Sequence, residues 1–584
     1  MKKIIKLWKH SLLRKIFATE KTKDRAFLIF ALITGVSAGL VAVLLHRLTQ
    51  YFIHLFGTNE AFGLKSFLFG GLSIALATYL ITRFFPSSSG SGIPGTSLSF
   101  TAFHGKIPFR DTISKFMTTI LSLASGFSLG LEGPIVAISS GIGSFIGESM
   151  VMPTKKVKAL LATGSAAGIA AAFNTPMAAV IFTLEEIVGD LNATKVLGPI
   201  IISSVIAAVT ATSLNGNNST FGDFSYKLND SRELILYLLV GILAALFGVL
   251  WVKTVLKFRK INKEKFKGKK IIFSLIVFLL IGILSHLNTH ILGGGHHTII
   301  EILQSMISDW KVLIILFTLK FFVTALCYST GVSGGLFMPV LLMGACVGGI
   351  VGSLSLSFFP GSVQNIGAFA LVGMGAYFAA VIRSPFTSII MVFEMTRDYN
   401  IILPLMIANI VSYLISSNFL KGSIYDYISE QDGVHLPTIG EDHEILDNLV
   451  IEDAMNKAPY CLTSELPVLQ AFKKVKNSPY SGFPILKNGL LVGMISRNDL
   501  KAKCAKGFGE KSIQEVCTKT IIKVYPDQSL LLAFHKLKKY HISRIPIVSR
   551  INDKEIVGII TPEDIVNQFG YHIQEESSKN KPLS

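Results

Sequence analysis

The stretch Gly130-Leu131-Glu132-Gly133-Pro134 places one carboxylate in the middle of a long apolar region of the chain. A charged side chain inside a bilayer is costly, so an acidic residue there is a candidate functional group. The flanking glycines leave backbone N–H groups accessible, and proline suits the first turn of a helix, whose N-terminus attracts anions. The stretch therefore predicts an anion site that Glu132 fills when ionised and leaves when protonated.

The composition around this stretch is that of a polytopic membrane protein. Only 16% of the 584 residues are charged, and the mean hydropathy is +0.54, which is too apolar for a set of soluble domains. Apolar runs of spanning length recur at 27–45, 65–82, 194–212, 235–252, 271–285, 312–326 and 401–420. Three further runs, 114–150, 159–187 and 334–395, are interrupted by Gly and Pro. Interrupted runs of this kind are typical of membrane segments that line a cavity.

The formal net charge of +18 is concentrated in three segments, Met1–Arg25, Lys155–Lys158 and Lys253–Lys270. By the positive-inside rule these segments face the cytoplasm, so we expect a bacterial inner-membrane protein with both termini inside. Residues 1–26 are expected to form a cytoplasmic amphipathic segment rather than a cleaved signal peptide. The lysines flank membrane spans and do not form one basic domain, which argues against nucleic acid as a partner.

The apolar region is duplicated. Ser125–Pro134 aligns without gaps on Thr330–Pro339, and at the same offset Gly143 pairs with Gly348 and Gly147 with Gly352. A second block, Gly164–Glu185 on Gly373–Glu394, follows in the same order. Repeats that contain broken helices are typical of secondary transporters, whose substrate site lies between the halves. We therefore expect Gly130–Pro134 and Gly335–Pro339 to meet at one site.

Three other segments are candidate parts of this site. Ser88–Pro94 is a Gly- and Ser-rich break whose hydroxyl and N–H groups can ligate an anion without holding it as tightly as a lysine would. Glu185-Glu186 either end a helix at the cytoplasmic surface or include a proton acceptor that serves Glu132. Tyr425 is either an interfacial tyrosine or a phenol donor to a bound anion.

These segments resemble the CLC family of chloride channels and transporters. The family's GSGIP motif is matched by Gly90–Pro94, its GREGP motif by Gly130–Pro134 except at Leu131, and its GGxFxP motif by Gly334–Pro339. The resemblance implies an all-α membrane domain over 27–430, built from two inverted halves at about 27–215 and 230–430. It also implies a homodimer with one anion pathway in each subunit.

The resemblance also implies roles for individual residues. Chloride would be coordinated by the Ser91 hydroxyl, the backbone N–H groups of Leu336 and Phe337, and the Tyr425 hydroxyl. Glu132 would be the gating and proton-exchanging carboxylate, and Glu186 the internal proton acceptor. The family usually has arginine or lysine where this chain has Leu131, so we expect a changed voltage or pH dependence of the gate.

The part of the chain that follows a linker at 431–448 is soluble in character and contains a second duplication. Ser481–Leu486 corresponds to Ser543–Val548, and Gly493–Asp499 to Gly558–Asp564. The pattern resembles a pair of CBS domains, an α/β module expected at 449–505 and 511–570, with a disordered tail at 571–584. Ser496, Asp499, Thr561 and Asp564 are either capping residues or ligands of an adenine nucleotide.

The sequence thus favours a proton-coupled chloride antiporter that is not an enzyme and needs no cofactor or metal, with a passive gated chloride channel of the same fold as the alternative. An intramembrane protease with CBS domains would need a metal motif or a Ser/His dyad within the membrane, and the sequence has no HExxH. A magnesium transporter with CBS domains would need acidic ligands along its pore, whereas the candidate segments here are rich in N–H and hydroxyl groups.

Overall fold

The computed structural model describes residues 20–191, 193–216, 220–222, 226, 233–358, 365–433, 446 and 449–569. Residues 1–19, most of the predicted linker at 431–448 and the predicted disordered tail at 571–584 lie outside the described residues. The chain divides into two compact units. A helical unit ends at Leu436, and a C-terminal unit begins at Pro437, with residues 101–104 grouped with the latter.

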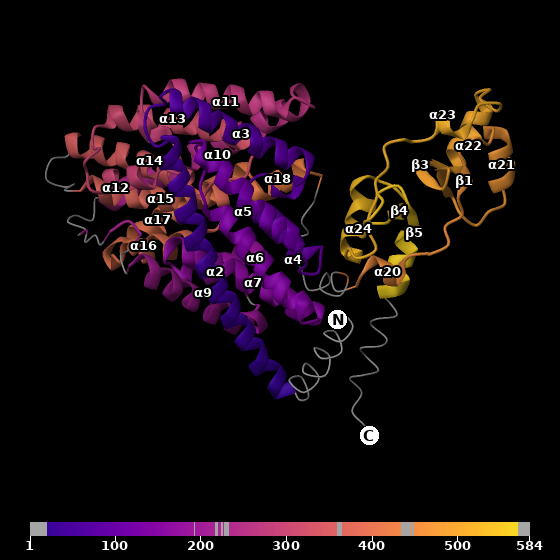
Figure 1. Cartoon of the computed structure of the whole chain (residues 1–584), viewed down its shortest axis with the longest axis horizontal. Coiled ribbons are helices and arrows are strands. Elements are labelled where there is room, and N and C mark those ends of the chain that lie inside the picture. Colours follow the sequence, from indigo (N-terminus) through magenta and orange to yellow (C-terminus); the bar gives the residue numbers. More distant parts are fainter. Residues whose placement is uncertain are drawn as a thin grey trace. The chain divides into compact units, whose positions relative to one another are not determined.

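The first half of the helical unit runs from a long helix to the end of α9 (Figure 1). Its elements are α2 (Glu20–Phe56), α3 (Leu64–Arg83), η1 (Pro86–Ser88), α4 (Ile93–Thr101), α5 (Phe109–Ala124), α6 (Glu132–Ser149), α7 (Thr154–Phe173), α8 (Pro176–Phe182), the π-helical turn η2 (Thr183–Val188) and α9 (Thr194–Asn215).

The second half repeats this series and adds a final short helix. Its elements are α10 (Glu233–Lys265), α11 (Lys270–Ser285), η3 (Thr289–Ile291), α12 (His296–Leu303), α13 (Trp310–Ser329), α14 (Phe337–Phe358), α15 (Ile366–Ile382), α16 (Pro385–Thr396), η4 (Tyr399–Ile401), α17 (Ile402–Phe419) and α18 (Ile424–Gln431).

Within the described residues, eight helices are long and apolar enough to cross a membrane. Six of the seven predicted runs coincide with these spans, and the seventh, 271–285, forms a shorter apolar helix. That run forms α11, which has only 16 residues because turns at both of its ends stop it short of a full span. Conversely, α7 and α14 are continuous spans inside runs predicted to be interrupted, and they are mostly buried. Their glycines serve close helix packing and do not break the helices.

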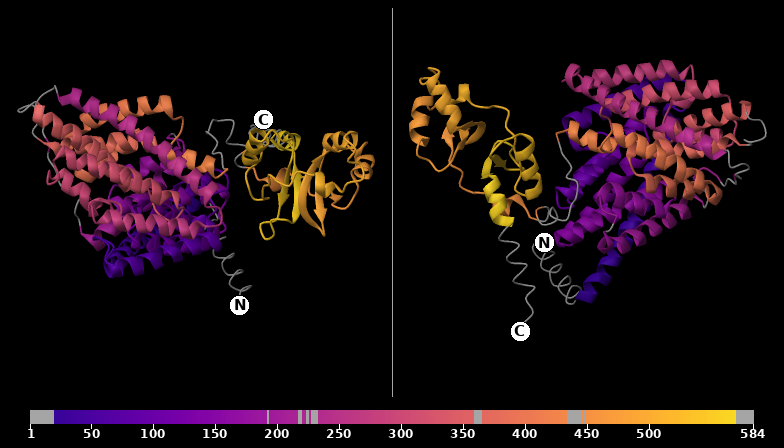
Figure 2. Two further views of the ribbon diagram at one scale, coloured as in Figure 1. Left: turned by 90° about the horizontal axis from the view of Figure 1, so that it is seen from above. Right: turned by 180° about the vertical axis from the view of Figure 1, so that it is seen from behind.

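The packing confirms the duplication. The pairs α6–α7, α7–α9, α2–α9 and α5–α6 recur as α14–α15, α15–α17, α10–α17 and α13–α14. Equivalent elements also meet each other across the halves, α3 with α11, α6 with α14 and α8 with α16. Figure 2 shows the two halves as adjoining groups of helices. Reciprocal contacts of this kind require a two-fold relation between the halves.

The C-terminal unit contains two similar α/β cores. Its elements are α20 (Ile451–Ala454), β1 (Leu462–Thr463), α21 (Val468–Val475), β2 (Gly482–Lys487), β3 (Leu490–Ser496), α22 (Arg497–Ala505), α23 (Ile513–Val516), α24 (Leu530–Lys539), β4 (Ile545–Val548) and β5 (Ile556–Ile560). The antiparallel pairs β2–β3 and β4–β5 have equivalent registers, with Phe483 opposite Ile495 and Ile545 opposite Ile560. This equivalence confirms the second predicted duplication, and each copy has its own apolar cluster.

Candidate functional site

Three Gly-rich breaks meet in the interior of the helical unit. The Gly130 N–H donates to the Gly335 carbonyl at 2.8 Å, and the Gly335 N–H donates back to the Gly130 carbonyl at 2.7 Å. This contact is antiparallel, so the two copies of the motif run in opposite directions, as an inverted repeat requires. The third break joins them because Gly90 N–H donates to Val332 and Gly334 N–H to the Gly90 carbonyl, both at 3.1 Å. The prediction that the two halves' motifs meet is confirmed.

The glycines at this junction leave no room for side chains. A Cβ atom on Gly335 would lie 2.9 Å from the Gly133 nitrogen, and one on Gly133 would collide with the Ser91 hydroxyl. Gly90 and Gly92 have φ angles of 69° and 93°, a region that residues with a Cβ rarely adopt. The backbones of the three breaks therefore approach each other closely here.

The residues predicted to bind an anion belong to these breaks or lie beside them. Ser91 and Tyr425 are each 1% exposed, and neither hydroxyl has a hydrogen-bond partner in the described part of the chain. The Tyr425 hydroxyl, carried by α18, faces Ser91. Leu336 and Phe337 are fully buried at the start of α14, where backbone N–H groups have no partner inside the helix. Buried donors of this kind in one place are suited to binding an anion.

Glu132 is the first residue of α6 and is 7% exposed. Its carboxylate faces the backbone N–H groups of Leu131, Glu132 and Met338, so it lies at the N-termini of both α6 and α14. Oε2 has no hydrogen-bond partner among the described residues, and the side chain folds back over Gly130. This placement is that of an anion held by two helix dipoles.

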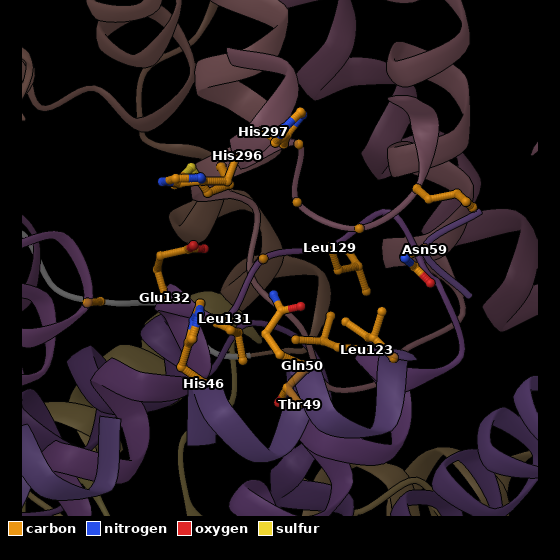
Figure 3. A pocket seen from close by; sticks show the side chains of 18 of the residues that line it. His46, Thr49, Gln50, Asn59, Leu123, Leu129, Leu131, Glu132, His296 and His297 are labelled. Carbon is orange, nitrogen blue, oxygen red and sulfur yellow. The ribbon is translucent and has the colours of Figure 1, made fainter. Parts of the chain in front are cut away.

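Glu132 also lines an open cavity of about 720 Å³. The cavity wall comes from α2, the start of α6, the Gly293–Gly295 loop and α12. Figure 3 shows the Glu132 carboxylate turned toward the interior of this cavity, with His46 and His296 on either side in that view. Water in the cavity can therefore reach the neighbourhood of the carboxylate.

The neighbouring acids Glu185 and Glu186, both on η2, have different surroundings. Glu185 accepts the backbone N–H groups of Phe386 at 3.3 Å and Thr387 at 3.0 Å, which lie at the start of α16. Its repeat equivalent Glu394 accepts those of Met177 at 3.0 Å and Ala178 at 2.7 Å, at the start of α8. Each acid thus caps a helix of the other half, and Glu185 has a structural partner that accounts for its presence.

Glu186 makes no such cap. Its carboxylate accepts hydrogen bonds from the Ser423 hydroxyl at 2.9 Å and the Ser384 hydroxyl at 3.4 Å. Ser423 begins α18, which also carries Tyr425, and both Glu186 and Glu132 lie within electrostatic range of the Tyr425 hydroxyl. Glu186 is therefore a partly buried acid that is connected to Tyr425 through α18. It accepts a hydrogen bond from Ser423, and Tyr425 lies two residues further along the chain.

Sequence reasoning missed a third repeated block. Lys115 donates to the carbonyls of Ser88 and Gly90 at 3.0 and 2.6 Å. Lys320, its equivalent in α13, donates to those of Ile291 and Gly293 at 3.0 and 2.7 Å.

The two loops that these lysines hold have matching backbones. Gly293 and Gly295 have φ angles of 57° and 94°, against 69° and 93° for Gly90 and Gly92. The stretch Gly293–His297 is thus the counterpart of Gly90–Pro94. Lys115 and Lys320 are separated by the same number of residues as the pairs of the block Ser125–Pro134 and Thr330–Pro339. This equal offset could have identified the two lysines as a repeat pair from the sequence.

In the C-terminal unit, Ser496 with Asp499 and Thr561 with Asp564 form reciprocal helix caps. Each hydroxyl accepts the backbone N–H of its aspartate, at 3.0 and 3.3 Å, and donates to that aspartate's Oδ2 at 2.6 and 2.7 Å. Every one of these bonds to a carboxylate uses Oδ2.

Comparison with known proteins extends over both units. The family described as "Voltage gated chloride channel" matches residues 70–417, and the CBS domain matches 451–506 and 513–570. An H(+)/Cl(−) exchange transporter ClcA of Vibrio campbellii is 31% identical over 415 residues, covering 69% of this chain and 88% of that protein.

Two solved structures are similar to the chain. The crystal structure of a slow cyanobacterial Cl−/H+ antiporter superposes with a TM-score of 0.64 and 25% identity, over 70% of this chain and 97% of that one. A eukaryotic CLC transporter, at 21% identity, shares the fold with a TM-score of 0.62 over 92% of this chain and 97% of that one.

Proposed function

The chain belongs to the voltage-gated chloride channel family, and we propose that it is a membrane transporter that exchanges chloride for protons. The observation that carries the proposal is the position of Glu132, a carboxylate at two helix N-termini beside buried hydroxyls that lack partners. The relative from Vibrio campbellii, which is named an H(+)/Cl(−) exchange transporter, supports the same assignment.

Chloride binds in the space between the three breaks. The Ser91 and Tyr425 hydroxyls donate to it from one side, and the N–H groups of Leu336 and Phe337 donate from the start of α14. Neutral donors and a helix dipole stabilise the anion without fixing it, because they supply only partial charges. The Lys115 ammonium donates hydrogen bonds to the Ser88 and Gly90 carbonyls. It therefore stabilises the loop and does not bind the chloride ion directly.

Ionised Glu132 competes with chloride because its carboxylate lies against the Met338 N–H, in the same turn of α14 as the chloride donors. Protonation removes the charge that the two helix N-termini stabilise, and the neutral side chain moves toward the cavity. Chloride then takes the vacated position. Proton binding to Glu132 therefore opens the site to chloride, which moves in the direction opposite to the proton.

Glu186 receives the proton on the inner side. The Ser384 and Ser423 hydroxyls can donate to its carboxylate and, by rotating, accept from its carboxylic acid form, so both protonation states keep hydrogen bonds. Glu185 is excluded from this role by its cap on α16.

We also propose the assembly and regulation expected from sequence. The protein is a homodimer in a bacterial inner membrane, with both termini cytoplasmic, and the CBS pair binds an adenine nucleotide at Asp499 or Asp564. Chloride is the transported substrate in this account, and transport requires no bound cofactor.

The test is paired flux from liposomes that contain the purified protein. An outward chloride gradient should drive protons inward against a small pH gradient, recorded with a chloride electrode and a pH electrode in the same sample. Chloride efflux without any proton uptake would instead identify a passive channel, and no chloride flux at all would reject both functions.

A further inference from the structure

The cavity in front of Glu132 has an unusual set of ionisable side chains. Among its described lining residues these are five histidines and two glutamates, with no lysine or arginine. The set is His46, His54, His290, His296, His297, Glu132 and Glu301. Imidazole changes its charge between about pH 5 and 8, so the charge of this cavity follows the pH of the water that fills it.

Two of the histidines are seen near the Glu132 carboxylate in Figure 3. In Figure 3 the Glu132 carboxylate is seen between the rings of His46, on α2, and His296, the first residue of α12. Both histidines are exposed to the cavity, whereas Glu132 is 7% exposed. His46 and His296 are close enough to affect each other's charge. Both rings and the carboxylate line the same cavity, so a proton can pass among them through its water.

The fold fixes which atom of His296 can exchange a proton. Nε2 lies 3.0 Å from the Thr220 carbonyl, which can only accept, so Nε2 keeps its hydrogen. The ring also packs against Phe221, with centroids 5.4 Å apart. Nδ1 is then the atom that gains and loses a proton. Burial lowers the pKa of this imidazole, the Thr220 carbonyl opposes the effect, and the rings of His46 and His297 reinforce it.

The other histidines of the cavity differ from this pair. His290 and His297 each lie beside Glu301, at 3.3 and 3.2 Å, so a charge on either is compensated locally. His54 is on the same helix as His46, about two turns further along.

The charged groups that face the pair are few. Arg47, which follows His46 on α2, donates to the Leu214 carbonyl and the Asn215 side chain. Glu132 on α6 lines the same cavity, and His297 and Glu301 lie on the same helix as His296.

We propose that His46 and His296 carry protons between the water of the cavity and Glu132. The proposal rests on the exchange function proposed above. In the inward step, a ring N–H bond of the imidazolium breaks and an O–H bond forms on the Glu132 carboxylate, directly or across one water. The ring is left neutral and takes its next proton from cavity water. The reverse transfer returns protons to the outside.

The test is proton flux through liposomes that contain the full chain, with the pH on the cavity side varied from about 5 to 8. We expect His46→Gln with His296→Gln to slow proton uptake about tenfold at neutral pH and to remove the dependence on pH in the histidine range. In His46→Ala with His296→Ala, imidazole added to the solution should restore the flux. The control His54→Gln removes an imidazole from the same cavity and should keep the wild-type rate and pH profile.

Several outcomes would overturn the proposal. One is a double variant with the wild-type proton flux and pH profile, and another is a deficit that imidazole does not restore. A third is an equal deficit in His54→Gln. If the double substitution also lowers the proton-independent chloride flux of Glu132→Ala, the rings act on chloride and the proton role is rejected. A wild-type protein that moves chloride but no protons would reject the exchange function itself, which separates the two failures.

Discussion

At the scale of single residues, the account depends on the charge of Glu132. Glu132→Gln keeps the size and shape of the side chain but fixes it in a neutral state. We expect chloride flux to persist and to lose its rise at low pH, because the neutral amide no longer competes for the N-termini of α6 and α14. Proton flux should fall to the background of empty liposomes. Proton pumping at the wild-type rate in this variant would show that another group carries the proton.

The adjacent acids give a matched pair of variants. We expect Glu186→Ala to abolish proton movement while chloride flux continues, because the internal acceptor is lost. Glu185→Ala should instead destabilise the protein by about 1–2 kcal/mol, since it removes the cap of α16. The two readouts are paired flux and thermal unfolding in detergent. If Glu185→Ala stops protons without lowering the melting temperature, the two roles have been assigned the wrong way round.

The sequence could predict these residues only in part. The offset between the repeats pairs Glu185 with Glu394, but it cannot show that each caps a helix of the other half. That contact joins residues about two hundred positions apart, and no local pattern encodes it. The roles of Ser91 and Tyr425 came from a family resemblance, whereas their lack of partners is visible only when the breaks are assembled.

At the scale of elements, the two halves should respond alike to equivalent changes. A Cβ on Gly143 would collide with the Leu160 carbonyl between α6 and α7, and one on Gly348 with the Phe369 carbonyl between α14 and α15. We expect Gly143→Ala and Gly348→Ala each to cost about 1–3 kcal/mol through overpacking. Gly95→Ala is the control, because a Cβ there meets nothing within 4 Å.

Melting temperatures of the three purified variants would check this prediction. A large loss for one of the paired glycines and none for the other would argue that the halves do not share their packing. An equal loss in Gly95→Ala would show that helix interiors here resist any added methyl group.

Element boundaries were harder to predict from sequence than element types. Hydropathy identified α11 to within one residue, but α7 begins at Thr154, before the predicted run at 159–187, because its first turn carries lysines. The match between Gly90–Pro94 and Gly293–His297 was missed because the two loops share backbone conformation and a buried lysine contact, and hardly any side chains. A repeat that is preserved in backbone φ angles but not in residue types is hard to detect from the sequence.

At the scale of the whole molecule, the C-terminal unit offers a separate prediction. If adenine nucleotide binds at the CBS pair, ATP at about a hundred times its dissociation constant should stabilise that unit by about 2.7 kcal/mol. The full-length protein should then show a raised melting transition, and Asp499→Asn with Asp564→Asn should lose the increase. Thermal unfolding with ATP and with inorganic triphosphate as control would check it. No shift with ATP would leave Ser496, Asp499, Thr561 and Asp564 as helix caps alone.

The organisation of the whole chain was the part that the sequence predicted most fully. A duplicated apolar region and a duplicated soluble region are visible as repeats, because repeats survive in spacing even when single residues change. The contacts between the two halves could not be predicted from the spacing of the repeats. The antiparallel contact of Gly130 with Gly335 depends on the complete fold, and it is this contact that forms the site.

The reversal potential of the reconstituted protein tests the central claim most directly. With equal chloride on both sides and a pH gradient across the membrane, a protein in which Glu132 and chloride alternate in one pocket must move charge. The account predicts a reversal potential that shifts steadily with the size of the pH gradient. A reversal potential that stays at zero for every pH gradient, while chloride still carries current, would contradict it.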